Sequence, residues 1–275
     1  MTLGSMSDRS ARRVISRHAM PELCAALSGA DAPIFVGRAG WSLSRSDQMH
    51  FPAEGSHLVR YAQRLPAVEI NSSFYRPHRR ATYGRWAASV GDGFRFAVKM
   101  PRSITHAHRL VDAGALLDRF FQEVGGLGQR LGCVLVQLPP SLLLDRRSAA
   151  SFFAALRDRF DGHVALEPRN ASWFTPEAER LLVGARVGRV AADPPPVGTV
   201  PGPSAWPGLV YYRLHGSPIV YHSSYEQAYL TTLAGVLATR RSEGSCVWCI
   251  FDNTARGAAT ENALDLSHRL GADHG

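Results

Sequence analysis

The chain contains a single lysine, Lys99, although thirty of its residues are arginine. This lysine lies in the segment FRFAVKMPRSITH, residues 94–106, at the end of an apolar run. Arginine keeps its charge at any working pH, whereas lysine is compact and loses its proton more easily when it is removed from water. A bias toward arginine explains why lysine is scarce but not why one remains at this place. Lys99 is therefore a candidate for chemistry that arginine cannot perform.

Carboxylates and a histidine occur at comparable positions, at or just after the ends of apolar runs. Glu69 and Glu167 form a candidate acid/base pair beside Lys99, and Asp193 and His106 are further candidates for a catalytic role. The alternative is that Lys99 only balances the charge of Glu69 and Glu167. Burial lowers the pKa of a lysine and nearby carboxylates raise it, so the sequence leaves its protonation state open.

A second set of side chains suits the binding of a polar, anionic ligand. Arginine side chains such as Arg169 and Arg213 recognise carboxylate or phosphate groups through two parallel hydrogen bonds. The segment 252–259 opens a predicted helix, whose free backbone N–H groups favour an anion. The alternative for the charged members is pairing within the protein. The predicted substrate-binding residues are Asn71, Tyr75, Gln137, Arg169, Trp173, Arg213, His215, Asn253 and Arg256.

The same region offers ligand types for a divalent metal, namely three carboxylates and His215. However, Lys99 and Arg213 lie at the same level of the predicted site and repel a cation. We therefore predict no metal ligands and no cofactor, and keep a divalent metal as the lesser alternative.

Strands and helices alternate along the chain and position these residues. Eight short apolar runs have the length and the boundaries of buried strands, at residues 32–41, 67–74, 94–101, 133–140, 163–170, 186–193, 209–216 and 246–253. Helical patterns occupy residues 56–65, 81–90, 113–128, 148–160, 175–185, 224–241 and 255–270. The sixth crossover, residues 194–208, is rich in proline and is predicted to be a loop without a regular helix.

This order predicts an α/β fold, a TIM-like (β/α)₈ barrel in a single domain formed by residues 33–275. Residues 1–32 are predicted to be an N-terminal extension, partly disordered or with one short helix. Catalytic groups of such barrels sit at the carboxyl ends of the strands. A ring of buried charges there exceeds what packing requires, because each desolvated charge costs several kcal/mol before pairing offsets it.

Composition limits the partners. With 45% hydrophobic and 20% charged residues the chain is an ordinary globular protein. It has no apolar run of the roughly 18–20 residues that span a membrane, and its N-terminus is a poor secretory signal. We expect a cytoplasmic protein without a membrane partner, and the sequence gives no oligomeric state. Cys246 and Cys249 form a C-x-x-C pair within CVWCIF, but a strand points them to opposite faces, so we expect packed thiols.

Six segments, which occur in order between about residues 34 and 266, carry a family resemblance: EINSSFYRPH, FRFAVKMPRSITH, LGCVLVQLPPS, ALEPRNASWF, YYRLHG and FDNTARGAATENAL. They resemble the YecE-like family, also called domain of unknown function 72. The resemblance implies a TIM-like barrel, in agreement with the strand count, and no settled activity. The residues that match the family's motifs are Glu69, Asn71, Phe74, Tyr75, Lys99, Thr105, His106, Gln137, Glu167, Arg169, Trp173, Arg213, His215 and Asn253.

Two positions depart from the family's pattern. The segment after the fifth strand usually reads Glu-Phe-Arg-His, and here Asn170 replaces the histidine, so one proton donor or ligand is missing. Arg38 stands at the end of the first strand, where a small residue is usual; it narrows the mouth or adds affinity for anions.

These observations favour an enzyme that uses Glu/Lys acid–base chemistry on a small anionic ligand, such as a sugar phosphate or a nucleotide. Whether it is a hydrolase, a lyase or an isomerase stays open. The net charge of +8 also permits a nucleic-acid-binding barrel, with aromatic side chains that stack on bases. A regulatory domain without turnover is the third alternative.

Overall fold

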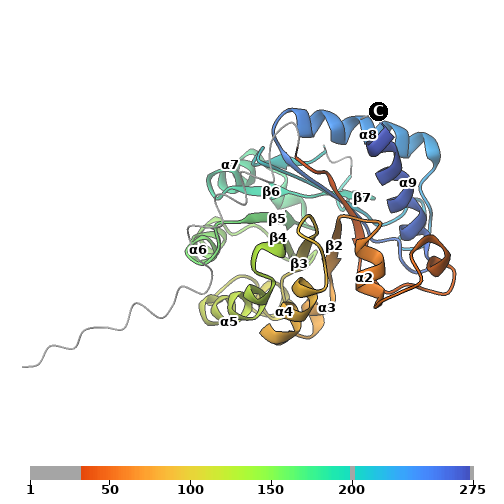
Figure 1. Cartoon of the computed structure of the whole chain (residues 1–275). Coiled ribbons are helices and arrows are strands. Elements are labelled where there is room, and N and C mark those ends of the chain that lie inside the picture. Colours follow the sequence, from red (N-terminus) through yellow and green to blue (C-terminus); the bar gives the residue numbers. More distant parts are fainter. Residues whose placement is uncertain (1–31, 199–201, 273–275) are drawn as a thin grey trace, which may run out of the picture.

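The computed structural model describes residues 32–198 and 202–272, which form one α/β domain around a curved sheet (Figure 1). Ten strands occur in the described residues. They are β1 (Phe35–Ala39), β2 (Ala67–Ile70), β3 (Arg95–Lys99), β4 (Leu131–Gln137), β5 (His163–Glu167), β6 (Val187–Arg189), β7 (Ala191–Asp193), β8 (Ser204–Ala205), β9 (Leu209–Leu214) and β10 (Cys246–Phe251).

The sheet curls until its two ends meet. Its order is β7-β9-β10-β1-β2-β3-β4-β5-β6-β8, and every pair is parallel except β6 with β8. Only Val190 separates β6 from β7. The segment formed by β6, Val190 and β7 therefore pairs on two sides: β6 pairs with β5, and β7 pairs with β9 at the other end of the sheet. The result is a nearly closed, barrel-like sheet.

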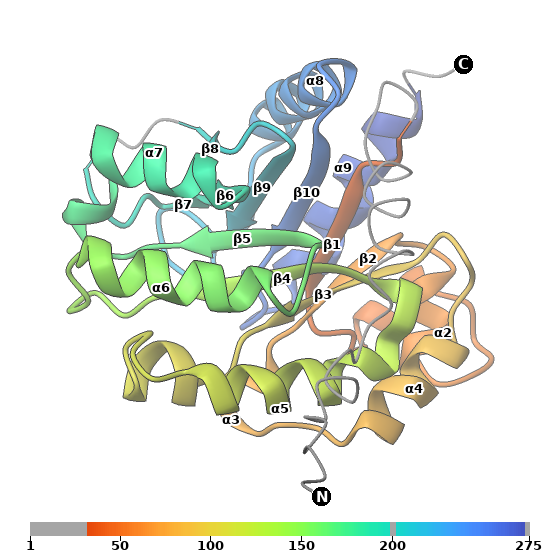
Figure 2. The same cartoon turned by 90° about the vertical axis from the view of Figure 1, so that its left-hand side faces the viewer.

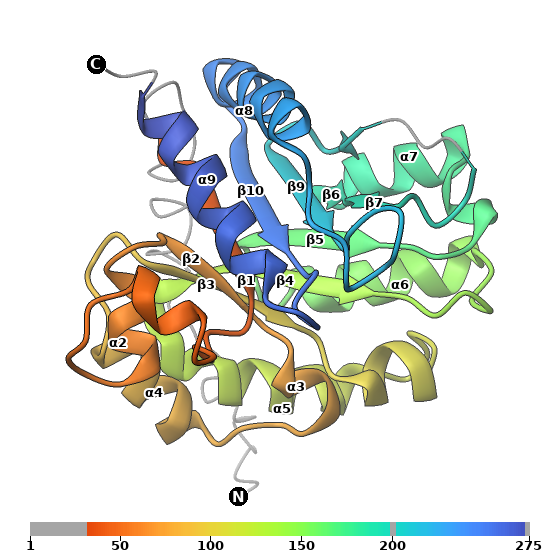
Figure 3. The ribbon, with the colours of Figure 1, turned by 90° about the vertical axis from the view of Figure 1, so that its right-hand side faces the viewer.

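Helices lie outside the strands and cover the sheet (Figures 2 and 3). They are α2 (His57–Ala62), α3 (Ser72–Tyr75), α4 (Arg80–Ala88), α5 (Gly114–Val124), α6 (Arg146–Arg157), α7 (Pro176–Gly184), α8 (Gln227–Ser242) and α9 (Ala258–Ala272). Short helical turns are η1 (Asp47–His50), η2 (Ser103–Ala107), η3 (Gly125–Arg130) and η4 (Ala171–Trp173). Asp145 and Thr175 cap α6 and α7 by accepting backbone hydrogen bonds, as their residue types favour.

The predicted strands and helices are confirmed, with three differences. The sixth strand is divided into β6 and β7. The second strand ends at Ile70 rather than at residue 74, because the helical turn α3 begins at Ser72, and the Ser73 hydroxyl contacts the carbonyls of Ile70 and Lys99. The sixth crossover has no helix in its described part, but it adds the short strand β8. Residues 1–31 of the predicted N-terminal extension lie outside the described residues.

Two apolar layers hold the fold together. The larger one packs between the sheet and the helices, and the smaller one fills the interior of the curved sheet. In the interior, Trp248 stacks on Phe35 and Tyr211, with ring centroids 4.7 and 5.8 Å away. Cys246 belongs to the inner layer and Cys249 to the outer one, which confirms that the two thiols point to opposite faces.

The packing around Trp248 predicts that the interior tolerates no added atom at Gly132. A Cβ at this position would lie 2.6 Å from the Trp248 ring and 3.0 Å from the Cβ of Arg95. We expect Gly132→Ala to lower the free energy of unfolding by about 1–3 kcal/mol, as overpacked cores do. The measurement is urea denaturation.

The control is Gly235→Ala on α8, where an added Cβ meets no atom within 4 Å. Alanine in an exposed helix is expected to be neutral or to stabilise by about 0.5–1 kcal/mol. Equal effects of the two substitutions would contradict the interior packing described above.

Candidate functional site

The candidate site continues the inner layer of the sheet toward the carboxyl ends of the strands. On five strands, apolar inner residues are followed two positions later by a charged one, because alternate residues of a strand share a face. These pairs are Ala67 and Glu69, Ala97 and Lys99, Ala165 and Glu167, Tyr211 and Arg213, and Ile250 and Asp252. The alternation therefore brings charges from five strands to one level.

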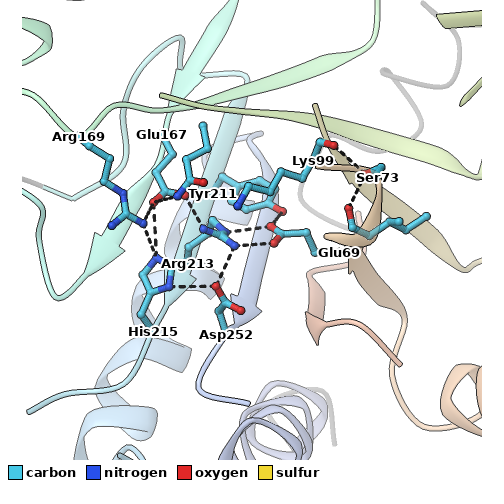
Figure 4. Close-up of polar contacts among 11 residues, drawn as sticks. Glu69, Ser73, Lys99, Glu167, Arg169, Tyr211, Arg213, His215 and Asp252 are labelled. Atoms are coloured by element: carbon cyan, nitrogen blue, oxygen red, sulfur yellow. Dashed lines mark hydrogen bonds and ion pairs between the residues drawn. The ribbon is translucent and has the colours of Figure 1, made fainter. Parts of the chain in front are cut away.

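Arg213 is the centre of this cluster and has no exposed surface (Figure 4). Its Nε and Nη2 donate to the two oxygens of Glu69, at 3.0 and 2.7 Å. Nη1 donates to Glu167 at 2.6 Å, and Nη2 also donates to Asp252 at 3.0 Å. Burial acts to lower the pKa of Arg213, but the carboxylates outweigh it and raise the pKa well above its usual value. The guanidinium is permanently charged and already fully engaged.

Glu167 and Asp252 are held in their charged forms. Burial acts to raise both pKa values, yet Arg213 and then His215 lower them, that of Glu167 well below its usual range. Arg169 also binds Glu167 directly, and the Gln137 amide donates to it at 3.3 Å. Neither carboxylate is thereby suited to take up a proton near neutral pH.

His215 joins the two carboxylates. Its Nδ1 lies 3.1 Å from Asp252 and its Nε2 lies 3.6 Å from Glu167. Burial acts to lower the pKa of His215, but these two carboxylates outweigh it and raise the pKa. Its ring also meets the edge of Tyr221, which is partly exposed at the mouth. The two carboxylates therefore favour the protonated form of His215.

Lys99 reaches over this cluster from β3 (Figure 4). Among the described residues, none lies within hydrogen-bonding or ion-pairing distance of its Nζ. The Phe74 ring lies 4.3 Å from Nζ, and the residue as a whole is 9% exposed. Burial and the nearby Arg213 lower the pKa of Lys99, and the carboxylates only partly oppose them. Lys99 is thus a buried amine without a counter-ion of its own.

The charges of the cluster balance without Lys99. The three carboxylates that Arg213 binds face two guanidinium groups, those of Arg213 and Arg169, and the His215 imidazole. When His215 carries a proton, three negative and three positive charges are present. A protonated Lys99 is then a surplus positive charge in a low-dielectric site. This surplus charge favours loss of the proton from the Lys99 amine, or else the binding of an anionic ligand beside it.

Three of the predicted site residues, His106, Tyr75 and Asn71, lie at the rim above Lys99. They make few contacts with the charged cluster. His106 lies on η2, where its Nδ1 is 2.8 Å from Thr105 Oγ1 and its ring meets the edge of Phe74. Burial lowers the pKa of His106, and Lys99 adds to the effect. Tyr75 is 73% exposed and also touches Phe74. The side-chain oxygen of Asn71 is buried without a hydrogen-bond partner in the described structure.

Asp193 does not join the cluster, contrary to the prediction. It is paired in register with Leu214, whose side chain packs in the outer apolar layer. Residues in register on parallel strands point to the same face, so Asp193 faces outward. Its carboxylate accepts a 2.7 Å hydrogen bond from the Tyr225 hydroxyl.

Trp173 and Asn253 are buried and are held by contacts within the protein. Trp173 is buried in the outer layer and its Nε1 donates to the Leu142 carbonyl at 3.0 Å. The Asn253 amide donates to the Ser223 carbonyl at 2.9 Å and to Asn262 at 3.0 Å, which fixes the loop after β10 to α9.

Arg256 lies in a separate cavity of about 440 Å³ between the loops after β1 and β10. Arg38 lines the same cavity, where it is paired with Asp47 at 3.5 Å and donates to Thr260 at 2.8 Å. The arginine that departs from the family's pattern is thus neutralised within the protein.

Sequence reasoning missed two members of the cluster. Asp252 was passed over in favour of Asn253, because CVWCIF is apolar on both faces and gives no alternation from which to choose. Tyr211 resembles a core residue in the run LVYYRL, but its hydroxyl donates to Glu69 at 2.8 Å. The spacing of two between Tyr211 and Arg213 indicates a shared face and was available as a signal, whereas nothing in CVWCIF distinguishes Asp252 from Asn253.

Across the described ranges, no group of three or more His, Cys, Asp or Glu side chains has an arrangement suited to a metal ion. The carboxylates of the cluster face Arg213 instead. Nor does any helix in the described structure have the length and apolar character needed to cross a membrane.

The central position of Arg213 predicts a large effect of its removal. Arg213→Met leaves three buried carboxylates without their partner, and we expect the free energy of unfolding to fall by about 3–5 kcal/mol. Urea denaturation measures this loss. The control is Arg45→Met at an exposed arginine, which we expect to change stability by less than about 0.5 kcal/mol.

A second variant distinguishes lost charge pairing from lost packing. Adding Glu69→Gln and Glu167→Gln to Arg213→Met removes two of the unpaired charges and should recover part of the stability. A triple variant less stable than the single one would contradict the electrostatic account.

Comparisons with known proteins agree with this fold. UPF0759 protein YunF of Bacillus subtilis (strain 168) is 27% identical over 149 residues, 52% of this chain and 53% of that protein, so the match spans about half of this curated relative. UPF0759 protein YecE of Escherichia coli (strain K12) is 28% identical over 106 residues, 38% of each chain.

Two solved structures of DUF72 family proteins share the fold. The protein from Enterococcus faecalis V583 has a TM-score of 0.72 at 22% identity, covering 87% of this chain and 96% of that one. The protein from Thermotoga maritima MSB8 has a TM-score of 0.68 at 24% identity, covering 86% and 99%. The model of the family described as "Protein of unknown function DUF72" matches residues 35–275. The chain therefore belongs to the DUF72 family.

Proposed function

We propose that this protein is an enzyme that binds a small anionic, phosphate-bearing molecule at the carboxyl ends of its strands, with Lys99 as the group that transfers a proton. One observation carries the proposal: Lys99 is buried beside a charge-balanced cluster, and its amine has no partner among the described residues. A structural lysine at this level would be expected to pair with one of the carboxylates. Whether the reaction is a hydrolysis, an elimination or an isomerisation stays open.

The roles of the two glutamates follow from their pairing. Glu69 and Glu167 are engaged by Arg213, so we assign them to the electrostatic framework rather than to direct proton transfer. This assignment leaves Lys99 as the base in its neutral form, and as the acid once it is protonated. A general base works best when its pKa lies near the operating pH, and the lowered pKa of Lys99 moves it in that direction.

We infer an anionic ligand because the site presents the cationic side chains of Arg169 and Lys99. The Arg169 side chain is 25% exposed although it binds Glu167, so part of its guanidinium faces the mouth. Lys99 adds a surplus positive charge whenever it is protonated. Exposed guanidinium edges bind phosphate and carboxylate through charge-assisted hydrogen bonds.

The position of the site is also typical of barrel enzymes. We propose that β6 and β7 act as one strand, which makes the sheet an eight-stranded TIM-like barrel with its site at the mouth. We also propose a cytoplasmic location, which is supported by the buried, reduced thiols of Cys133 and Cys249.

The proposal predicts that phosphate-bearing metabolites raise the melting temperature of the protein. A ligand at one hundred times its Kd stabilises by about 2.7 kcal/mol. We expect Lys99→Met and Arg169→Met to lose the shift, and Arg45→Met to keep it. The measurement is thermal unfolding with inorganic phosphate, sugar phosphates and nucleoside monophosphates.

The same assay separates the alternative of a nucleic-acid-binding surface, for which the exposed Tyr75 and Tyr221 are candidate stacking side chains. That alternative requires affinity for single-stranded oligonucleotides that falls steeply with added salt. If Lys99→Met and Arg169→Met both retain every shift shown by the wild type, the proposed site is wrong.

A further inference from the structure

We propose that Lys99 is a nucleophile that forms an imine with the carbonyl group of an anionic aldehyde or keto acid. This inference deepens the proposed function and rests on it, because it assigns a substrate class to the same site. It adds a covalent step at Lys99, the only lysine of the chain, to the anion binding proposed for that site.

The surroundings of Lys99 meet the requirements for such a nucleophile. A lysine attacks a carbonyl only as the neutral amine, and desolvation or a neighbouring cation favours that form. Lys99 has both, since it is 9% exposed and lies beside the permanently charged Arg213. Glu69 and Glu167, which would otherwise keep an ammonium ion in place, are bound by that arginine.

The geometry keeps the amine accessible and oriented. Lys99 ends β3 at the mouth, and its backbone carbonyl is held by the Ser73 hydroxyl at 2.7 Å. The Phe74 ring lies 4.3 Å from the amine, and no described residue forms a hydrogen bond or ion pair with Nζ. The Arg169 guanidinium, which binds Glu167 in the same cluster and whose side chain is 25% exposed, suits the anionic end of the same molecule.

The chemistry balances without an external oxidant or reductant. The Lys99 nitrogen bonds to the carbonyl carbon, and the carbonyl oxygen takes up a proton to give a carbinolamine. The carbon–oxygen bond then breaks, and the oxygen leaves as water with the two hydrogens that the amine gives up. The product is a neutral carbon–nitrogen double bond. We assign His106 to carry a proton between the nitrogen and the oxygen. Its ring and the Lys99 amine both contact the Phe74 ring.

The test is reductive trapping of the full-length wild-type protein with glyoxylate or pyruvate and sodium cyanoborohydride at pH 7. The borohydride reagent reduces an imine to a stable secondary amine, which intact-mass and peptide mass spectrometry detect. Because Lys99 is the only lysine, an adduct on a lysine identifies the site without ambiguity. The N-terminal amine is the only other primary amine and serves as an internal standard of reactivity.

A matched control places an ordinary lysine in the same chain. Arg119 on α5 is a 69% exposed side chain that pairs with Glu123 at 2.9 Å, so Arg119→Lys adds an ordinary surface amine. We expect Lys99 to be modified faster than the introduced lysine by about tenfold or more, because desolvation favours its neutral form and binding raises the local concentration of the probe. Lys99→Arg, which keeps the charge, is expected to give no lysine adduct.

The outcomes distinguish this inference from the proposed function. Selective adduct formation at Lys99, suppressed by inorganic phosphate, supports both. If modification is confined to the N-terminal amine while phosphate-bearing ligands still shift the melting temperature, the imine is wrong and the anion site stands. If the introduced lysine reacts as fast as Lys99, the site gives no activation and the inference is overturned.

Discussion

A guanidinium group that is closed off from water lies at the centre of the site. Arg213 binds Glu69, Glu167 and Asp252 at once, from three different strands of the sheet. Each of these charges would be strongly unfavourable alone in the interior, and a buried group of this kind is tolerated only when its hydrogen bonds are made. The curvature of the sheet therefore depends on Arg213, since the three carboxylates reach it only when their strands surround it.

The same interaction determines the chemistry available to its neighbours. Because Arg213 takes the carboxylates, Lys99 lies among negative charges and yet pairs with none of the described side chains. Its environment is set by burial and by an adjacent positive charge, the two conditions that favour a neutral amine. His215 takes the opposite role, because its two carboxylate neighbours favour the imidazolium form. The cluster thus shifts the pKa of His215 upward and that of Lys99 downward, toward each other.

Much of this was predictable from the sequence, and the failures have physical causes. Alternation placed Glu69, Lys99, Glu167 and Arg213 on the inner face, because each follows an inner residue by two positions. The prediction failed at Asp193, because Gly188, Val190 and Ala192 face inward by strict alternation and Asp193 therefore falls on the outer face. It failed again at Asn253, since CVWCIF is apolar on both faces and a one-residue slip exchanges them. A hydrogen bond between distant strands, such as that of Tyr211 with Glu69, leaves no pattern in the local sequence from which it could be predicted.

The central claim is that Arg213, rather than Lys99, neutralises the buried carboxylates and leaves the lysine amine unpaired. The most direct measurement is the titration of Lys99 by NMR in protein labelled with ¹³C at lysine Cε, where the one lysine gives one resonance. The account predicts a pKa below the value of about 10.4 that is usual for a solvated lysine. A pKa at or above that value would show that Lys99 is an ion-paired ammonium group and would contradict the account.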